Sequence, residues 1–255
     1  MMIHLFDQNS QGEPGTGVMA YRETEHTRAR KANTRQRLLH AARDLVAEQG
    51  FAAATAAAVA ERSGVAAGTI YRHFPNKPEL VAEVFRYATE HEVAQVAAAS
   101  ESRNVADAYA LRLARAVAVF ARRALQGPQL AYALIAEPVD PRVEQERLRY
   151  RMAYADIFED LIRDGIASGE FAAQDAGISA AALVGLLSEA LIGPLFPGQA
   201  KTNSANELPQ MAARAAMTSK EQQQLIQQLC ALSLRALGSA EANSIAEDVS
   251  YEHQR

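Results

Sequence analysis

Residues 34–77 are the stretch that most constrains the fold of this chain. They are predicted to form three short helices and the start of a fourth, with one turn short enough to need glycine. Ala60, Gly64 and Ile70 supply a small residue where two helices touch, a residue that tolerates positive φ, and an apolar anchor. This pattern predicts a helix-turn-helix, which places one helix in the major groove of DNA. An ordinary helical hairpin shares the pattern, so these positions alone leave both readings open.

The residues after the turn favour DNA binding. The run from Gly68 to Lys77, GTIYRHFPNK, resembles the signature of the TetR family of bacterial transcriptional regulators, and the resemblance extends over residues 30–86. It implies an all-α fold, with an N-terminal three-helix helix-turn-helix domain that binds DNA. A C-terminal helical domain would bind a ligand and form the dimer.

The resemblance also implies which residues contact DNA. The start of the third helix would read base edges, while hydroxyl, imidazole and amino groups around it would contact phosphates. The residues carried over in this way are Thr34, Arg35, Thr55, Ala67, Gly68, Thr69, Tyr71, Arg72, His73 and Lys77. Arg72 can instead lie in solvent. The basic segment 28–31 is either a DNA-contacting arm or a solvated helix entry.

The distribution of charge agrees with a polyanion that touches one end of the molecule. The whole chain has a formal net charge of −4. Residues 22–77 carry ten Lys and Arg against five Asp and Glu, whereas residues 78–255 carry sixteen against twenty-three. A basic segment on an acidic body is expected of a protein that binds DNA through one domain.

Helix boundaries follow from capping residues and from glycine and proline. We expect helices at 34–49, 56–63, 67–73 and 77–99, with Thr34, Thr55 and Asn76 as N-caps. Ala66 precedes the third helix and offers no side-chain acceptor, so we expect that helix to be weakly held without DNA. Further helices are expected at 105–126, 128–136, 140–168, 175–193 and 219–238, with a long loop at 193–218.

These elements give a division of the chain into four parts. Residues 1–27 are a disordered extension, 28–77 the DNA-binding domain, 78–240 the effector-binding and dimerisation domain, and 241–255 a polar, frayed tail. Either Met1 or Met19 can be the start.

A mixed aromatic and charged stripe on the helix at 140–168 predicts a ligand pocket between this helix and those at 105–126 and 175–193. An aromatic stripe at helical spacing also occurs in ordinary cores. The predicted pocket residues are Phe120, Tyr132, Arg147, Tyr150, Arg151, Tyr154, Phe158 and Leu183. An arginine among tyrosines indicates an anionic or aromatic effector.

One helix-turn-helix domain buries little groove surface, so a homodimer that reads a pseudo-palindromic operator is expected, and the family resemblance implies the same. Small and apolar residues place its interface on the last two predicted helices. The predicted interface residues are Ala180, Leu183, Leu187, Ala190, Leu225, Leu229 and Leu232. The alternative is that these residues fill the core of one protomer.

Other function classes lack a supporting motif. The sequence contains no phosphate-binding loop, no G-x-S-x-G, no H-E-x-x-H and no Cys/His metal spacing, so we expect neither an enzyme nor a cofactor. No signal peptide or membrane span is expected, and the one cysteine, Cys230, suits the cytoplasm. A helical DNA-binding adaptor that responds to a protein partner is the competing reading.

Overall fold

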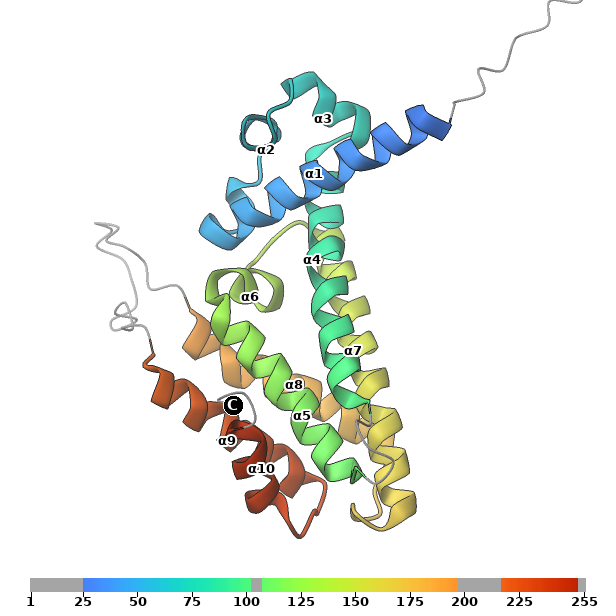
Figure 1. Ribbon diagram of the computed structural model, residues 1–255, viewed down its shortest axis with the longest axis vertical. Coiled ribbons are helices and arrows are strands. Elements are labelled where there is room, and N and C mark those ends of the chain that lie inside the picture. The colour runs from blue at the N-terminus through green and yellow to red at the C-terminus, as the bar shows by residue number, and fades with distance from the viewer. Residues whose placement is uncertain (1–24, 102–106, 197–216, 252–255) are drawn as a thin grey trace, which may run out of the picture.

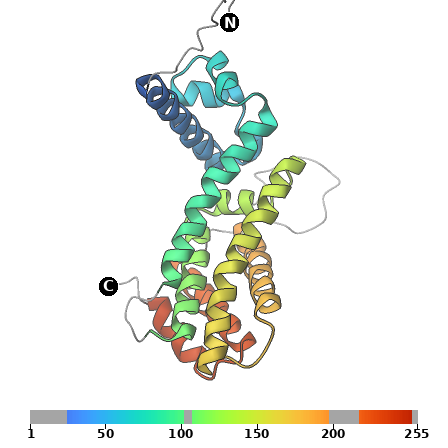
Figure 2. The same ribbon diagram turned by 90° about the vertical axis from the view of Figure 1, so that its right-hand side faces the viewer.

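The computed structural model describes residues 25–101, 107–196 and 217–251 of the chain. Within these ranges the chain forms ten α-helices and one short 3-10 helix, and it has no strand, which confirms the all-α prediction. A small head of three helices lies at one end of an elongated helical body (Figure 1). The long helix α4 runs from the head along the body beside α7 (Figure 2).

The head consists of α1 (Glu25–Gln49), the 3-10 helix η1 (Phe51–Ala53), α2 (Ala56–Ser63) and α3 (Ala67–His73). The predicted bounds of the second and third helices are correct. Gly50 ends α1 with a φ of 79°, a conformation that favours glycine. Thr55 caps α2 as predicted, because its hydroxyl accepts a hydrogen bond from the amide of Ala58 at 3.2 Å.

The predicted start of the first helix is wrong. α1 begins at Glu25, so residues 25–27 are helical rather than disordered, and Thr34 lies inside the helix rather than at its N-cap. The Thr34 hydroxyl donates a hydrogen bond to the carbonyl of Arg30 at 2.9 Å. The helical segment before Thr34 contains no glycine or proline, and more than half of it is Ala, Arg, Lys and Glu, which are good helix formers, so the helix extends through it.

The body contains the other seven helices. They are α4 (Lys77–Ser100), α5 (Tyr109–Gln126), α6 (Pro128–Ile135), α7 (Pro141–Ser168), α8 (Ala176–Leu195), α9 (Ser219–Ala236) and α10 (Ala242–Tyr251). The Asn76 side chain caps α4 by accepting from the amide of Glu79 at 2.9 Å. Most of the predicted loop at 193–218 lies outside the described residues.

Helix α10 overturns the prediction of a frayed tail after residue 240. Ala242, Ala246 and Val249 are 4%, 0% and 2% exposed, and they pack into the core of the body. Their spacing of four and three residues gives α10 one apolar face. That face consists mainly of alanine, so only its packing partners reveal it as a core helix.

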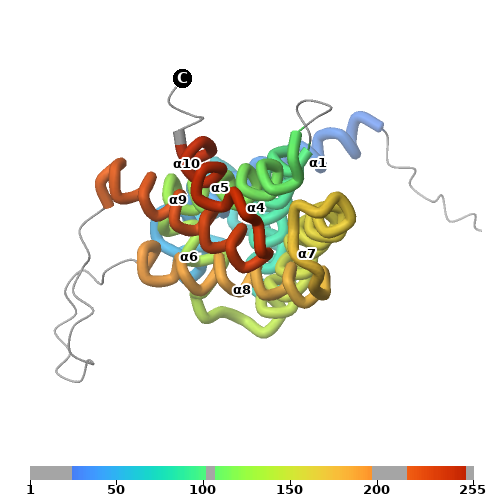
Figure 3. The backbone as a smooth tube through the Cα atoms, turned by 90° about the horizontal axis from the view of Figure 1, so that it is seen from below, coloured from blue at the N-terminus to red at the C-terminus, as the bar shows by residue number. Residues whose placement is uncertain are grey.

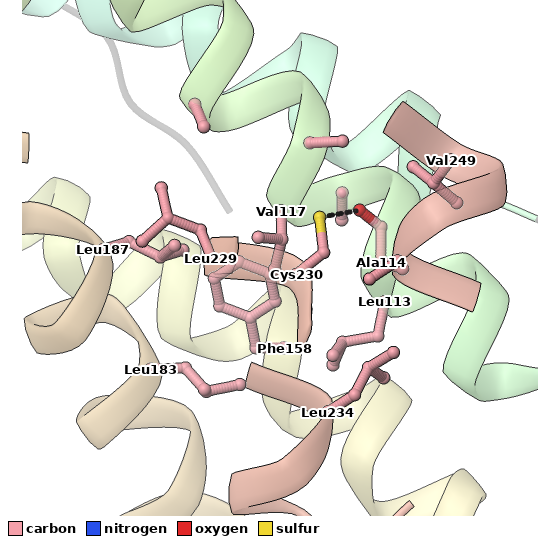
Figure 4. Close-up of a cluster of buried hydrophobic side chains, with 14 of the residues drawn as sticks. Leu113, Ala114, Val117, Phe158, Leu183, Leu187, Leu229, Cys230, Leu234 and Val249 are labelled. Atoms are coloured by element: carbon pink, nitrogen blue, oxygen red, sulfur yellow. Dashed lines mark hydrogen bonds between the residues drawn. The ribbon is translucent and has the colours of Figure 1, made fainter. Parts of the chain in front are cut away.

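The core of the body forms around α5, which contacts α4, α6, α7, α8, α9 and α10 (Figure 3). Leu113 and Val117 of α5 meet Phe158 of α7 and Leu229 of α9 in this cluster (Figure 4). Cys230 lies in the same cluster, where its thiol donates to the carbonyl of Ala114 at 3.5 Å. Burial raises the pKa of the Cys230 thiol to about 12, so this cysteine behaves as a small core residue.

Within the part of the chain that the structure describes, α8 is long and apolar enough to cross a membrane by length and composition alone. No membrane span was predicted from the sequence. A core helix of a water-soluble protein meets the same criterion, and Ala180, Leu183, Leu187 and Leu191 of α8 are buried in the body core. The criterion is therefore weak evidence for a membrane span.

Candidate functional site

The turn between α2 and α3 has the geometry that the three key positions predict. Gly64 adopts a left-handed conformation with φ of 68°, and the amide of Val65 donates to the carbonyl of Ala60 at 3.0 Å. Ala60 and Ile70 are 3% and 1% exposed, so both lie in the contact between the helices. The turn thus fixes α3 across α2 and leaves the other side of α3 in solvent.

The start of α3 is open to an approaching DNA duplex. Ala67 and Gly68 are exposed and Thr69 is half-buried. Ala66 precedes them and forms no side-chain cap, as predicted. An uncapped helix start with small side chains lets the backbone approach a groove or a phosphate closely.

The predicted phosphate contacts surround this helix start. Tyr71 is 58% exposed, and Arg72 and Lys77 are exposed as well. His73 is half-buried, and partial burial together with the charges of Lys31 and Arg35 lowers its pKa. At neutral pH His73 is therefore uncharged, and it can donate one N–H to a phosphate oxygen.

Arg35 lies inside α1 and not at a helix start, contrary to the prediction. Its guanidinium forms an ion pair with Glu83 of α4 at 2.7 Å and lies over the ring of Phe74, 5.1 Å from the centroid. Arg35 therefore fastens α1 to the end of α3 and to α4. The predicted position of Thr34 at a helix start is wrong for the reason given above.

Two other arginines hold the head together, and the sequence analysis did not identify either. Arg37 of α1 donates to the carbonyl of Ser63 at 2.7 Å, beside the turn. Arg62 of α2 binds both carboxylate oxygens of Glu48, at 2.7 and 2.6 Å. Both contacts join residues that are far apart in the sequence, so no local pattern predicts them.

A cavity of about 290 Å³ lies below the head. Five of the eight predicted pocket residues line it, namely Phe120, Arg147, Tyr150, Arg151 and Tyr154. The wall also includes residues from α1, α4 and α6, which were not predicted. The principal additions are Arg43, Phe85, Thr89, Glu92, Val96, Arg123, Leu130, Ala131, Leu134, Ile135, Val184 and Ser188.

The other three predicted pocket residues do not line the cavity. Phe158 and Leu183 are 0% and 2% exposed and belong to the core of the body (Figure 4). Tyr132 packs edge-on against Phe196, with the ring centroids 5.4 Å apart. Helical spacing places a residue on a face but does not say whether a neighbouring helix fills the space in front of it.

Most interior polar groups of the cavity, the Tyr154 phenol excepted, are bonded within the protein. Arg123 donates to both carboxylate oxygens of Glu92, at 2.5 and 2.9 Å. The hydroxyls of Thr89 and Ser188 donate to carbonyls of their own helices at 2.6 and 2.7 Å. Burial raises the pKa of Tyr154, so its phenol stays neutral. The interior is consequently suited to an apolar guest.

A chain of hydrogen bonds joins this cavity to the head. The guanidinium of Arg147, which is 8% exposed, donates to the carbonyls of Leu134 at 2.9 Å and Glu137 at 2.8 Å, at the end of α6. The carboxylate of Glu137 in turn accepts from the backbone amide of Phe51 at 3.0 and 3.2 Å. Leu130 and Leu134 of α6 belong to the same core cluster as the head helices.

The predicted dimer face is only partly available. Ala180, Leu183, Leu187 and Leu229 are buried in the core of one protomer, which corrects their assignment to an interface. Ala190 and Leu232 are exposed, and Leu225 is half-buried. The outer face of α8 carries Ile178, which is 72% exposed, followed by the small residues Ala181, Ala182 and Gly185.

Two family models match the chain. One, described as bacterial regulatory proteins of the tetR family, matches residues 38–84, and the other, a tetracyclin repressor-like C-terminal domain, matches residues 106–191. The chain belongs to the TetR family. The members of this family are bacterial regulatory proteins, and the residues that the first model matches include the helix-turn-helix of the head.

Curated relatives match parts of this TetR-family chain. An uncharacterised helix-turn-helix regulator of Mycobacterium bovis, Mb2936c, is 39% identical over 72 residues, which are 27% of this chain and 37% of that protein. The chain thus spans little more than a third of the first curated relatives it matches. The repressor KstR2 of Rhodococcus jostii is 25% identical over 151 residues, which are 55% of this chain and 69% of that protein.

Solved structures of other proteins share the fold. FadR of Bacillus subtilis, in complex with stearoyl-CoA, has a TM-score of 0.58 and 18% identity, over 84% of this chain and 97% of that chain. RolR, in complex with resorcinol, has a TM-score of 0.57 and 21% identity, over 86% of this chain and 95% of that chain. Within the described residues, no group of three His, Cys, Asp or Glu is placed to hold a metal ion.

Proposed function

We propose that this TetR-family regulator is a homodimeric repressor that binds a pseudo-palindromic operator and leaves it when a small molecule enters the cavity. The observation that carries the proposal is that α1, α4 and α6 contribute both to the wall of the cavity and to the core of the head. A guest that moves these helices also moves α3. FadR and RolR, which share the fold, were solved with small molecules bound.

On the DNA side, the groups at the start of α3 would contact bases, and the groups around it would contact phosphates. Ala67, Gly68 and Thr69 would meet base edges, and the Thr69 methyl can contact a thymine methyl. Tyr71 and Lys77 would contact phosphates on either side. Each head presents only these few side chains to base edges. Two heads bound to one operator are therefore needed to distinguish it from other DNA sequences.

On the effector side, the contact between Arg147 and the end of α6 supports a route for release. A guest that pulls on Arg147 or spreads α6 from α7 would shift Glu137, and with it the amide of Phe51 at the start of η1, just after α1. Release then requires that the guest bind better to the form in which the two recognition helices no longer match the operator.

The dimer would use the exposed face of α8 together with exposed residues of α9. Ile178, Ala182 and Gly185 lie at spacings of four and three residues, so they share one face of α8. Small residues on such a face allow two helices to approach closely. Leu232 of α9, which is 44% exposed, would extend the apolar contact.

DNA binding is tested by gel shift on the DNA upstream of the protein's own gene, over a range of salt concentrations. Lys77→Ala should weaken binding to all sequences alike and lower the slope of log affinity against log salt by about 1. Thr69→Ala should relax the preference for operator over mutated sites. Lys220→Ala, which removes an exposed lysine of the body, is the matched control and should leave the slope unchanged. An unchanged slope for Lys77→Ala would refute its assignment to a phosphate.

The dimer is tested separately by light scattering and ultracentrifugation. At Gly185 no neighbouring atom lies within 4 Å of the position that an added Cβ would occupy. Gly185→Arg therefore adds a long charged side chain on an open face, and the protomer should still fold. The variant should be monomeric and should lose operator affinity. A variant that stays dimeric would mean that the interface lies elsewhere.

The alternative, a DNA-binding adaptor that responds to a protein partner, predicts that no small molecule shifts the melting temperature of the full chain.

A further inference from the structure

We propose that the effector is an apolar carboxylate, such as a short fatty acid or an aromatic acid, whose acid group binds Arg151 and Arg43 at the rim of the cavity. This inference rests on the proposed function, because it names the guest of the same cavity. It follows from which charges in the wall are already compensated and which are not.

The cavity wall is strongly biased towards positive charge. Arg43, Arg123, Arg147 and Arg151 line it, and Glu92 is the only acidic residue of the described chain that does so. A cationic guest would be repelled by this set, while an anionic guest would be attracted. The sign of the guest's charge follows from this imbalance.

Two of the four arginines are fully engaged. Arg123 is bonded to both oxygens of Glu92. Arg147 forms an ion pair with Glu144 at 2.5 Å and also donates to the carbonyls at the end of α6. Moving either guanidinium to a guest would break several charge-assisted bonds.

The other two arginines keep binding capacity. Arg151 is exposed and has no acidic partner within the described residues. Arg43 has one contact, with Asp44 at 3.2 Å, and its side chain is 35% exposed. Each guanidinium presents five donors, and a carboxylate presents two oxygens that match this fork. Because both groups reach solvent, the acid of the guest would lose little of its hydration on binding.

The rest of the guest must be apolar and small. The hydroxyls of Thr89 and Ser188 and the Arg123–Glu92 pair are already bonded. Apart from the tyrosine rings, the remaining interior wall is formed by side chains such as Phe120, Leu134, Ile135 and Val184. A volume of about 290 Å³ is at the lower end for ligand sites and fits a body of about a dozen non-hydrogen atoms.

Arg43 gives this binding mode a consequence for the head. It belongs to α1, in the helix-turn-helix domain, whereas Arg151 belongs to α7, in the body. A carboxylate held by both would connect the two domains directly. The guest would then act on the head without relying only on α6.

The experiment is calorimetric titration of the full chain with octanoate and with 2-naphthoate, each compared with its neutral primary amide. At least one acid should bind with one site per protomer, and its amide should bind about tenfold more weakly or worse, because the amide lacks the charge-assisted bonds. The two acids distinguish an aliphatic from an aromatic guest. Equal binding of acid and amide, or no binding of either acid, would overturn the proposal.

Variants locate the acid group. Arg151→Gln should weaken acid binding about tenfold and leave amide binding unchanged, and Arg43→Gln should act in the same direction. Arg149→Gln is the matched control, since Arg149 lies on the same helix, is exposed and does not line the cavity. If Arg149→Gln weakened acid binding as much as Arg151→Gln, the acid would be bound by general surface charge and the site would be wrong.

Operator binding in the same samples separates this inference from the function it rests on. An acid that binds through Arg151 but leaves operator affinity unchanged would support the site and refute effector release. A protein that binds operator but neither acid would refute the ligand class and leave DNA binding intact.

Discussion

The bond between Glu137 and the amide of Phe51 can be removed by one substitution, Glu137→Ala. The two residues are 86 positions apart, and the bond joins the segment after α6 to the start of η1, which follows α1. Both carboxylate oxygens lie within 3.2 Å of the Phe51 nitrogen. Glu137→Ala leaves this amide without its protein acceptor and shortens no helix.

The size of the effect follows from the charge and burial of the contact. A hydrogen bond to a charged group contributes about 1.5–3 kcal/mol. Glu137 is only half-buried, so water can partly replace it, and we expect a loss of about 1–2 kcal/mol. This corresponds to a rise of about 5- to 30-fold in the opening of the Phe51 amide.

Amide hydrogen exchange measures this opening directly. The exchange rate of the Phe51 amide should rise by that factor in Glu137→Ala and by less in Glu137→Gln, which keeps a neutral acceptor. The amide of Val65 in the turn donates to Ala60 and is the internal control, and its rate should not change. Equal protection of Phe51 in the wild type and in Glu137→Ala would refute the link between α6 and the head.

Three further predictions concern packing, reactivity and order. Gly165→Ala would place a methyl 2.3 Å from the ring of buried Phe171, so we expect the free energy of unfolding to fall by about 1–3 kcal/mol. Adding Phe171→Leu should restore part of this loss. An unchanged melting temperature of Gly165→Ala would contradict the contact. Because burial raises the pKa of Cys230 to about 12, its thiol stays protonated at pH 8 in the folded protein. Iodoacetamide should therefore modify Cys230 only as fast as the protein unfolds. Rapid labelling of the folded protein would contradict the burial of Cys230. Residues 66–73 should gain amide protection when operator binds, because α3 lacks a side-chain cap, and equal protection in both states would argue against this.

Local signals in the sequence were sufficient for most of the head. Gly64, Thr55 and Asn76 act through backbone conformation and capping within three residues of their own position, so their roles can be predicted without the fold. The signature from Gly68 to Lys77 placed the family and the recognition helix. The start of α1 was misplaced because Thr34 is a good cap, but the nine residues before it are also compatible with a helix.

Other predictions failed because helical periodicity does not show what covers a face of a helix. Phe158, Leu183 and Leu187 have the same periodicity as pocket or interface residues, and only the packing of α5 and α9 against them makes them core. The same is true of α10, whose alanine-rich face becomes significant only against α5 and α9.

The sequence by itself determined that the chain is helical, where most of its helices end, and which two helices the turn at Gly64 joins, because each of these depends on residues a few positions apart. Only the tertiary structure decided which arginines are paired within the protein and which remain available to bind an anion. Arg35 is neutralised by Glu83, Arg147 is bound to the end of α6, and Arg151 is left at the rim of the cavity. The reason is that the partner of a long charged side chain is set by whichever helix packs beside it, and that neighbour can lie anywhere along the chain.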